Sequence, residues 1–247
     1  MQAARPAPPH RSVPDKLVVL SFDDAVSTQA TVAAPMVKKY GFGATFFICE
    51  FPPDFVDKHK YMSWRQIQQL NAMGFEIGSH TRTHTHVTAL TAPQFADELR
   101  YIEQKCGRYG IPRPRSFAYP AYVTSPMALQ VLRQRGYRFA RAGGGRAFDP
   151  VRDDALLIPS FSTTGDDPQR VLNDLQQAHD GRIVVLTIHG TPDVAHPPVT
   201  TPSALLARYL RYLHDHHYHV IAMRDLARYV PSRAPDGAAS GSKSHAP

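Results

Sequence analysis

Near its N-terminus the chain runs Leu17-Val18-Val19-Leu20-Ser21-Phe22-Asp23-Asp24, an apolar stretch that ends in two adjacent aspartates. A short, continuous apolar run of this kind is typical of a strand buried in a sheet. Two neighbouring carboxylates repel each other unless a cation neutralises one, which leaves the other available for proton transfer. Taken alone, Asp-Asp is more simply interpreted as a turn or a helix N-cap. The rest of the chain therefore decides between a turn and a site.

Matching ligands follow another short predicted strand. The stretch Gly74-Phe75-Glu76-Ile77-Gly78-Ser79-His80-Thr81-Arg82-Thr83-His84 places two imidazoles just beyond it. One carboxylate and two histidines form a catalytic zinc shell with an open position for water. The spacing of His80 and His84 is weak by itself, because 13 histidines in 247 residues give roughly 0.7 such pairs by chance. A third apolar run, 183–188, leads directly into His189 and favours a site.

Strands and helices alternate along the chain. The predicted strands cover 17–22, 44–49, 75–78, 116–118, 137–141, 156–158, 183–188 and 219–222. Helices are predicted between them, and capping patterns at Ser63, Thr91 and Ser125 mark where three of these helices begin. Repeated βα units in this number favour a parallel barrel over an open sheet. The carboxyl ends of all strands open on one face of such a barrel, where the candidate side chains converge.

Composition indicates one large domain. Of the 247 residues 43% are hydrophobic and 20% charged, and no apolar stretch is long enough to cross a membrane. The net charge is +7, but Lys and Arg are scattered, which favours a solvated basic surface over a nucleic-acid groove. Cys49 and Cys106 form no metal or redox motif and are expected to be buried and free.

Four stretches, taken in order, resemble the motifs of the polysaccharide deacetylases, the NodB-homology or carbohydrate esterase family 4 group. They are Ser21-Phe22-Asp23-Asp24, the stretch 74–84, Phe117-Ala118-Tyr119-Pro120 and Leu186-Thr187-Ile188-His189. The resemblance covers nearly the whole chain from Lys16 to Val230. It implies an α/β fold, a distorted parallel (β/α) barrel of seven or eight strands similar to a TIM barrel. It also implies metal-dependent removal of N- or O-acetyl groups from sugars.

The resemblance implies a role for each site residue. Asp23 is expected to be the general base and His189 the general acid. Asp24, His80 and His84 are expected to bind a divalent metal. Zn²⁺ suits this donor set best, and Co²⁺ or Ni²⁺ can replace it. The residues expected at the substrate are Tyr119, Pro120, Ala121 and Arg141, with a backbone N–H near Ala121 as the donor to the oxyanion.

The chain departs from the family pattern in two places. The third motif usually carries an arginine that orients the catalytic aspartate, but Ala118 stands there. Arg141 ends a predicted strand and should open on the catalytic face, whereas Arg115 precedes its strand, so Arg141 is predicted to orient Asp23. The Asp-Trp of the fourth motif has no clear copy, and Asp166 and Asp167 are expected to cap a helix instead.

The predicted function is a metal-dependent hydrolase that removes acetyl groups from a polysaccharide or oligosaccharide. The same metal chemistry would serve a C–N hydrolase acting on a small cyclic amide or imide. A non-catalytic glycan-binding module could also retain the fold. The presence of Asp23 and His189 beside three intact ligands argues against such a module, because binding needs neither a base nor an acid. The expected partner is an acetylated glycan, not nucleic acid.

Several other rings are possible sugar contacts. Trp64, Tyr119, Tyr122 and His196 could stack on a sugar, although rings this frequent belong more often to the core or the rim. The histidines at 214, 216, 217 and 219 are expected to be solvated near a helix end.

Both ends of the chain are expected to lie outside the folded domain. Residues 1–13 are rich in proline and 231–247 in Ser, Gly, Ala and Pro, which predicts a disordered arm and a disordered tail around a domain at 14–230. No signal peptide is recognised in the sequence as given. The family resemblance favours a place outside the cytoplasm, and the sequence leaves a cytoplasmic one open.

Overall fold

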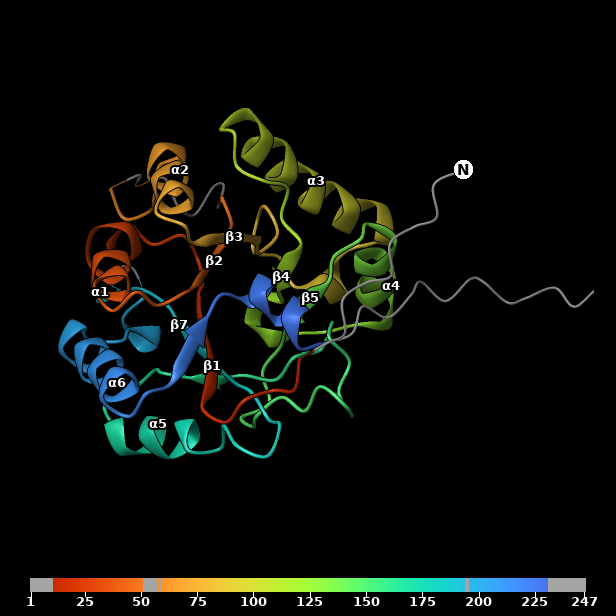
Figure 1. Ribbon diagram of the computed structural model, residues 1–247. Coiled ribbons are helices and arrows are strands. Elements are labelled where there is room, and N and C mark those ends of the chain that lie inside the picture. The colour runs from red at the N-terminus through yellow and green to blue at the C-terminus, as the bar shows by residue number, and fades with distance from the viewer. Residues whose placement is uncertain (1–10, 51–56, 58, 194–195, 231–247) are drawn as a thin grey trace, which may run out of the picture.

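Parallel strands form the centre of the computed structural model, and helices surround them (Figure 1). The structure describes residues 11–50, 57, 59–193 and 196–230, so the predicted disorder of 1–10 and 231–247 lies outside the described residues. Eight strands share one sheet, in the order β5-β4-β3-β2-β1-β7-β6 with β8 paired to β1. They are β1 (Leu17–Phe22), β2 (Thr45–Ile48), β3 (Glu76–Ser79), β4 (Ser116–Ala118), β5 (Phe139–Arg141), β6 (Phe161–Ser162), β7 (Val184–Ile188) and β8 (His219–Ile221).

The segment between β5 and β6 joins the two edges of this sheet. Arg141 of β5 makes a parallel bridge to Ile158, and the Ala142 N–H donates to the Ile158 carbonyl at 2.7 Å. β6 then pairs with β7. The segment thus closes the barrel, as expected, but the strand predicted at 156–158 is wrong. Ile158 makes a single bridge and the strand begins at Phe161, because Pro159 has no N–H to continue the ladder.

β8 distorts the barrel by entering between β1 and β2. The first half of β1 pairs with β8, and only its second half pairs with β2. Gly43, just before β2, lies so close to the end of β8 that a Cβ would come within 2.6 Å of the Ala222 nitrogen. Glycine is therefore required where the two strands diverge.

Helices cover the outside of the barrel, and the capping patterns confirm where they begin. The helices are α1 (Ala34–Lys39), α2 (Trp64–Ala72), α3 (Ala92–Arg108), α4 (Pro126–Gln134), α5 (Pro168–Leu175) and α6 (Ser203–Asp215). Ser63 and Thr91 form complete capping boxes, and Ser125 accepts from the Ala128 N–H. Asp167 caps α5, as predicted, by accepting from the backbone at Gln169 and Arg170.

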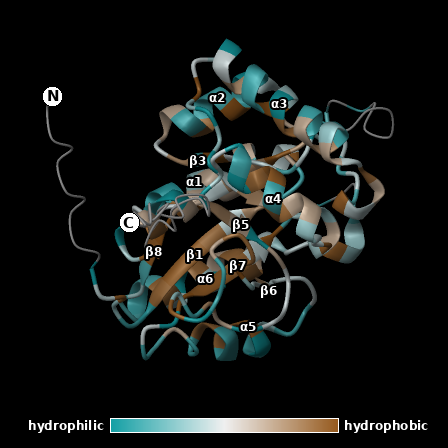
Figure 2. Ribbon diagram, turned by 90° about the vertical axis from the view of Figure 1, so that its right-hand side faces the viewer, coloured by the Kyte–Doolittle hydropathy of each residue, from teal (hydrophilic) through white to brown (hydrophobic). Residues whose placement is uncertain are grey.

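The core has one layer outside the strands and one inside. Along β1, Val18 and Leu20 pack with the surrounding helices, whereas Leu17 and Val19 face the interior. The strands are accordingly the most apolar part of the molecule (Figure 2). The 3₁₀ turns η5 (Met223–Arg228) add Met223 and Leu226 to the interior layer near the start of β1, which leaves the opposite end of the strands for a site.

The two cysteines agree with the expectation from the sequence. Cys49 and Cys106 are buried and free. In the described ranges, no helix combines the length and apolarity that a membrane span needs. Two residues of the arm predicted to be disordered at 1–13 contact the domain instead: the Arg11 N–H donates to the Arg228 carbonyl at 3.0 Å, and Val13 packs on the interior layer.

Candidate active site

A cleft of 910 Å³ opens at the carboxyl ends of the strands. Residues that follow or end β1, β3, β4, β6 and β7 line it, among them Asp23, Asp24, His80, His84, Ala121 and His189. These residues are far apart in the sequence. The barrel brings them together because its parallel strands all end on this face.

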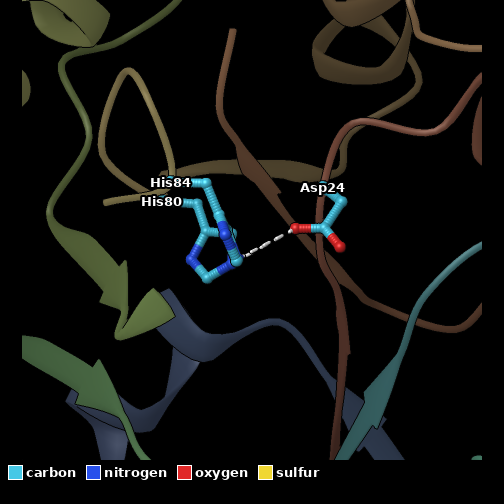
Figure 3. Close-up of side chains that lie close together, drawn as sticks. All are labelled: Asp24, His80 and His84. Carbon is cyan, nitrogen blue, oxygen red and sulfur yellow. Dashed lines mark ion pairs between the residues drawn. The ribbon is translucent and has the colours of Figure 1, made fainter. Parts of the chain in front are cut away.

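Asp24, His80 and His84 face one another in this cleft (Figure 3). The Oδ1 atom of Asp24 lies 3.4 Å from His80 Nε2 and 3.5 Å from His84 Nε2. One potential ligand atom from each of the three residues lies within 4.8 Å of the other two. Asp24 Oδ1 is buried and makes no hydrogen bond to any described residue. One carboxylate oxygen and two imidazole nitrogens around a common point fit a divalent metal ion.

Left-handed backbone positions direct these side chains. Asp24 has φ 73° and the next residue, Ala25, has φ 52°, so the chain turns sharply where β1 ends. His84 has φ 55°. Such conformations cost on the order of 1 kcal/mol each in residues other than glycine and collect at functional sites. Their presence at two of the three candidate ligands indicates that side-chain placement outweighs backbone preference here.

A backbone carbonyl fixes the orientation of His80. The buried Nδ1 lies 2.8 Å from the Ala118 carbonyl oxygen and must donate to it, because a carbonyl only accepts. Nε2 is then the unprotonated nitrogen of the neutral ring, and it faces Asp24. Metal-binding histidines are commonly oriented in this way by a hydrogen bond from the other ring nitrogen.

Glu98 of α3 holds the loop that carries His84. Its Oε2 accepts from the N–H of Arg82 at 2.8 Å, from the N–H of Thr83 at 2.7 Å and from the Thr83 hydroxyl at 3.0 Å. The sequence analysis missed this residue, because a glutamate inside an amphipathic helix has no local feature that distinguishes it from a solvated one.

Arg141 forms a buried ion pair with Asp23. Its Nη2 donates to Asp23 Oδ2 at 2.5 Å, and neither side chain is more than 3% exposed. The Tyr122 ring lies 5.1 Å from the guanidinium carbon. The end of β5 therefore places Arg141 against the aspartate, as its strand position predicts. Arg115 bonds to the Gly136 carbonyl instead.

Gln29 connects the ends of β1 and β7. Its buried amide nitrogen donates to the Asp23 carbonyl and lies 3.4 Å from the His189 carbonyl. His189 is 14% exposed, with Nε2 3.8 Å from Asp24 Oδ2. The sequence analysis missed Gln29 as well, since His189, its second partner, lies 160 residues further along the chain and comes near only through the pairing of β1 with β7.

Other predicted substrate residues occupy different environments. Ala121 lines the cleft with φ 48°, but Pro120 and Arg141 are buried and do not belong to the lining. Tyr119 borders the cleft, yet its side chain is fully buried and its hydroxyl donates to the Leu156 carbonyl at 3.1 Å. Its ring is therefore not a platform for a sugar, which corrects that expectation.

Of the other rings considered for sugar stacking, two line the cleft. Tyr122 and His196 both belong to its lining. Trp64 does not: its Nε1 donates to Glu50 at 3.1 Å and its ring stacks on Tyr109.

The charges of the site favour the metal-binding forms of Asp24 and His84. Burial alone would raise the pKa of Asp24, but the contact with His80 and the charges of His80, His189 and His84 hold it below its usual range. Burial, together with the charge of His80, lowers the pKa of His84 to about 4. Burial opposes protonation of His80, but Asp23 and Asp24 outweigh it and raise its pKa. At neutral pH, an ionised Asp24 and a neutral His84 are the forms that bind metals.

The open end of this parallel barrel holds a carboxylate and two imidazoles that fit a divalent metal, beside a second aspartate and a third histidine. The sequence model described as Polysaccharide deacetylase matches residues 10–140, just over half of the 247 residues. The chain belongs to this family of deacetylases.

A curated relative agrees with this membership. "Putative polysaccharide deacetylase YxkH" of Bacillus subtilis (strain 168) is 26% identical over 124 residues. The matched segment covers 50% of this chain and 43% of that protein, so less than half of the relative is represented.

Solved structures with this fold include a chitin deacetylase from Colletotrichum lindemuthianum, 16% identical with a TM-score of 0.62, covering 93% of this chain and 97% of that one. The Xyl-CE4 domain of a multidomain xylanase from the hindgut metagenome of Trinervitermes trinervoides is 21% identical, with a TM-score of 0.60 and coverage of 87% and 90%.

A third structure shows that this fold occurs without the activity. Wild-type BA3943 of Bacillus anthracis, described as a CE4 family pseudoenzyme, is 18% identical with a TM-score of 0.62, covering 90% of this chain and 69% of that one. At such identities the likeness shows the fold, and the fold alone does not show activity.

Proposed function

We propose that this protein is a metal-dependent deacetylase that removes N- or O-acetyl groups from a polysaccharide or oligosaccharide. The main support is that Asp23 and His189 lie in the same cleft as the Asp24, His80 and His84 cluster, with Arg141 paired to Asp23. A module that only bound glycans would need neither an acid nor a base. Nothing in the cleft specifically favours a small cyclic amide.

Asp24, His80 and His84 would hold the metal ion. One oxygen and two nitrogen donors suit Zn²⁺, and Co²⁺ or Ni²⁺ can replace it. When bound, such an ion lowers the pKa of a water molecule and polarises the carbonyl of the acetyl group.

Asp23 is proposed as the base that takes the proton of the attacking water. Arg141 bonds to Oδ2, whereas the buried Oδ1 has no hydrogen-bond partner among the described residues. Oδ1 is therefore the oxygen assigned to accept the proton, and Arg141 fixes the carboxylate in the orientation that this transfer needs. Gln29 supports the same residue through its backbone carbonyl.

His189 and Ala121 are proposed to act on the other side of the reaction. The His189 ring reaches the cleft and would protonate the leaving amine or alkoxide. The backbone N–H of Ala121, which lines the cleft in a left-handed turn, would donate to the oxyanion. A fixed amide stabilises charge that develops in the transition state without reorganising.

Acetate release from a panel of acetylated sugars, peptidoglycan fragments and cyclic imides, with and without added metal, tests the proposal. Asp23→Asn and His189→Ala should each lower kcat by about 10²- to 10⁴-fold and keep the metal content. Asp166→Asn, at an exposed position outside the cleft lining, is the matched control and should retain full activity. Turnover of imides alone would support the small-amide alternative. Glycan binding without any turnover would support a binding module.

A further inference from the structure

The loop after β7 contributes an apolar wall to the cleft. His196 and the 3₁₀ turn η4 (Pro197–Val199) all belong to the lining. The loop after β3 contributes polar groups instead, from Thr83, Thr85 and His86. One part of the cleft thus offers hydrogen-bonding groups, and another offers two proline rings, a valine and an imidazole.

Both ring nitrogens of His196 face fixed partners. Nδ1 lies 3.4 Å from Asp193 Oδ2, and Nε2 lies 3.2 Å from the Tyr61 hydroxyl. The backbone N–H of His196 also donates to Asp193 Oδ1 at 2.8 Å. The imidazole side chain is 32% exposed, while the Asp193 carboxylate is completely buried. Because its nitrogens are engaged within the protein, the ring mainly offers its carbon face to the cleft.

Asp193 is held by hydrogen bonds to residues near the start and near the end of the loop after β7. Its Oδ2 accepts from the Gly190 N–H at 3.3 Å, and its N–H donates to the Thr200 hydroxyl at 2.7 Å. A Cβ on Gly190 would lie 2.5 Å from Asp193 atoms, so only glycine allows this approach directly after His189. The wall is thereby tied to the strand that carries the proposed acid.

Tyr61 ties the wall to the metal side of the cleft. It makes an antiparallel bridge to Val26, two residues beyond Asp24, and the neighbouring Met62 N–H donates to the Ala25 carbonyl at 2.7 Å. The His196 ring is therefore fixed between the segment that follows the proposed acid and the segment that follows a proposed metal ligand. It lines the same cleft as the candidate metal ligands.

We propose that His196 and the Pro197–Val199 turn form a platform for the sugar ring next to the reacting acetyl group, with Asp193 and Tyr61 as its positioning residues. A pyranose has an apolar C–H face that gains by packing against a flat apolar surface. A ring already held at both nitrogens loses little conformational freedom when the sugar binds. This inference rests on the proposed deacetylase function, since it names the part of the substrate that the same site holds.

Two substrate types separate sugar recognition from the reaction itself. N-acetylated chitotetraose and O-acetylated xylotetraose carry sugar rings, whereas 4-nitrophenyl acetate carries only the acetyl group. His196→Ala should raise KM for the oligosaccharide about 10-fold, and this loss should exceed the loss on 4-nitrophenyl acetate by about the same factor. His214→Ala, at an exposed position on α6 outside the lining, is the matched control.

Two further variants distinguish a platform from a polar or structural role. His196→Phe keeps a flat ring and loses both nitrogens, so KM should stay within about 3-fold of wild type. His196→Asn can still donate to Asp193 but lacks the ring, and it should resemble His196→Ala. Melting curves and metal content show whether each variant is folded and loaded.

Several results would overturn the platform. Normal KM in His196→Asn would mean that the bond to Asp193 is what matters, and equal losses on both substrate types would place His196 in the reaction. An unchanged KM in His196→Ala, with an active wild type, would reject the platform and leave the deacetylase function standing. Failure of the wild type on both oligosaccharides would count against the proposed function itself, and with it the platform.

Discussion

Asp23 and Asp24 are neighbours in the chain, but their carboxylates have different partners. Asp23 pairs with the Arg141 guanidinium at 2.5 Å, and Asp24 faces two imidazoles at 3.4 and 3.5 Å. The left-handed backbone of Asp24 separates the two side chains. Their mutual repulsion is therefore relieved in two ways, by a fixed arginine for one and by a candidate metal site for the other.

Removal of a single imidazole should strongly weaken metal binding. His80→Ala and His84→Ala each delete one of three donors, and the expected loss of affinity for Zn²⁺ is about 100-fold or more. Elemental analysis of protein purified without chelator measures the metal content. His86→Ala removes a cleft-lining histidine outside the cluster and should leave that content unchanged. Full metal content in both ligand variants would show that the cluster is not a metal site.

Loss of Arg141 should affect both activity and stability. Arg141→Ala leaves the buried Asp23 carboxylate without its cation, which should lower the free energy of unfolding by about 3–5 kcal/mol. kcat should fall while metal content stays, because Arg141 contacts Asp23 and not the metal cluster. Chemical denaturation and kinetics measure the two effects.

The same substitution in an Asp23→Asn background provides the control. With no charge to compensate, the stability cost of Arg141→Ala should shrink. An equal cost in both backgrounds would mean that the guanidinium serves packing, and Arg141 would then have no role in orienting Asp23.

At the scale of elements, the sequence predicted most strands and helices because their signals are local. The capping boxes at Ser63 and Thr91 act within one turn of helix, so no tertiary information is needed to place those helix starts. The strand predicted at 156–158 lies instead at Phe161–Ser162 (β6). Its position depends on which residue of this segment can pair with β7 after the bridge to β5. Gln29 and Glu98 could not be found for a similar reason, since their partners come from distant segments.

Glu98 connects a helix to the candidate metal site, and its removal should weaken metal binding indirectly. Glu98→Ala deletes the acceptor of three hydrogen bonds in the loop that ends at His84, and the affinity for Zn²⁺ should fall about 10-fold. Glu98→Gln keeps an acceptor oxygen and should lie in between. Competition with a chromogenic chelator measures the affinity.

Asp97→Ala is the matched control for this element. Asp97 is exposed on the same helix and pairs with Arg100, away from the loop. Its substitution should change neither metal affinity nor melting temperature appreciably. If Glu98→Ala behaved in the same way, the loop would be held by its own backbone and Glu98 would have no positioning role.

Over the whole molecule, the barrel has a buried carboxylate at the end opposite the cleft. Glu76, the first residue of β3, accepts from the hydroxyls of Thr45 and Ser116 and from the Arg224 N–H, each at 2.7 Å. These donors belong to β2, β4 and η5. Glu76 therefore joins three parts of the chain where the η5 turns meet the barrel, and burial raises its pKa above the ordinary value of 4.5.

This raised pKa predicts how the stability of the molecule depends on pH. Between 4.5 and the raised value, the folded state binds more protons at Glu76 than the unfolded state does, so this residue's contribution to stability falls as pH rises through that window.

Glu76→Gln has no proton to bind and can still accept from Thr45 and Arg224 while donating to Ser116. The free energy of unfolding of Glu76→Gln minus that of wild type should therefore be larger at pH 8 than at pH 4.5. Denaturant unfolding across that range measures this difference. Glu76→Ala, which leaves the donors without an acceptor, should cost about 2–4 kcal/mol at pH 4.5, and this cost should shrink as pH rises to 8. A difference between wild type and Glu76→Gln that stayed constant from pH 4.5 to 8 would show that Glu76 is ionised equally in both states, and that its hydrogen bonds offset its burial.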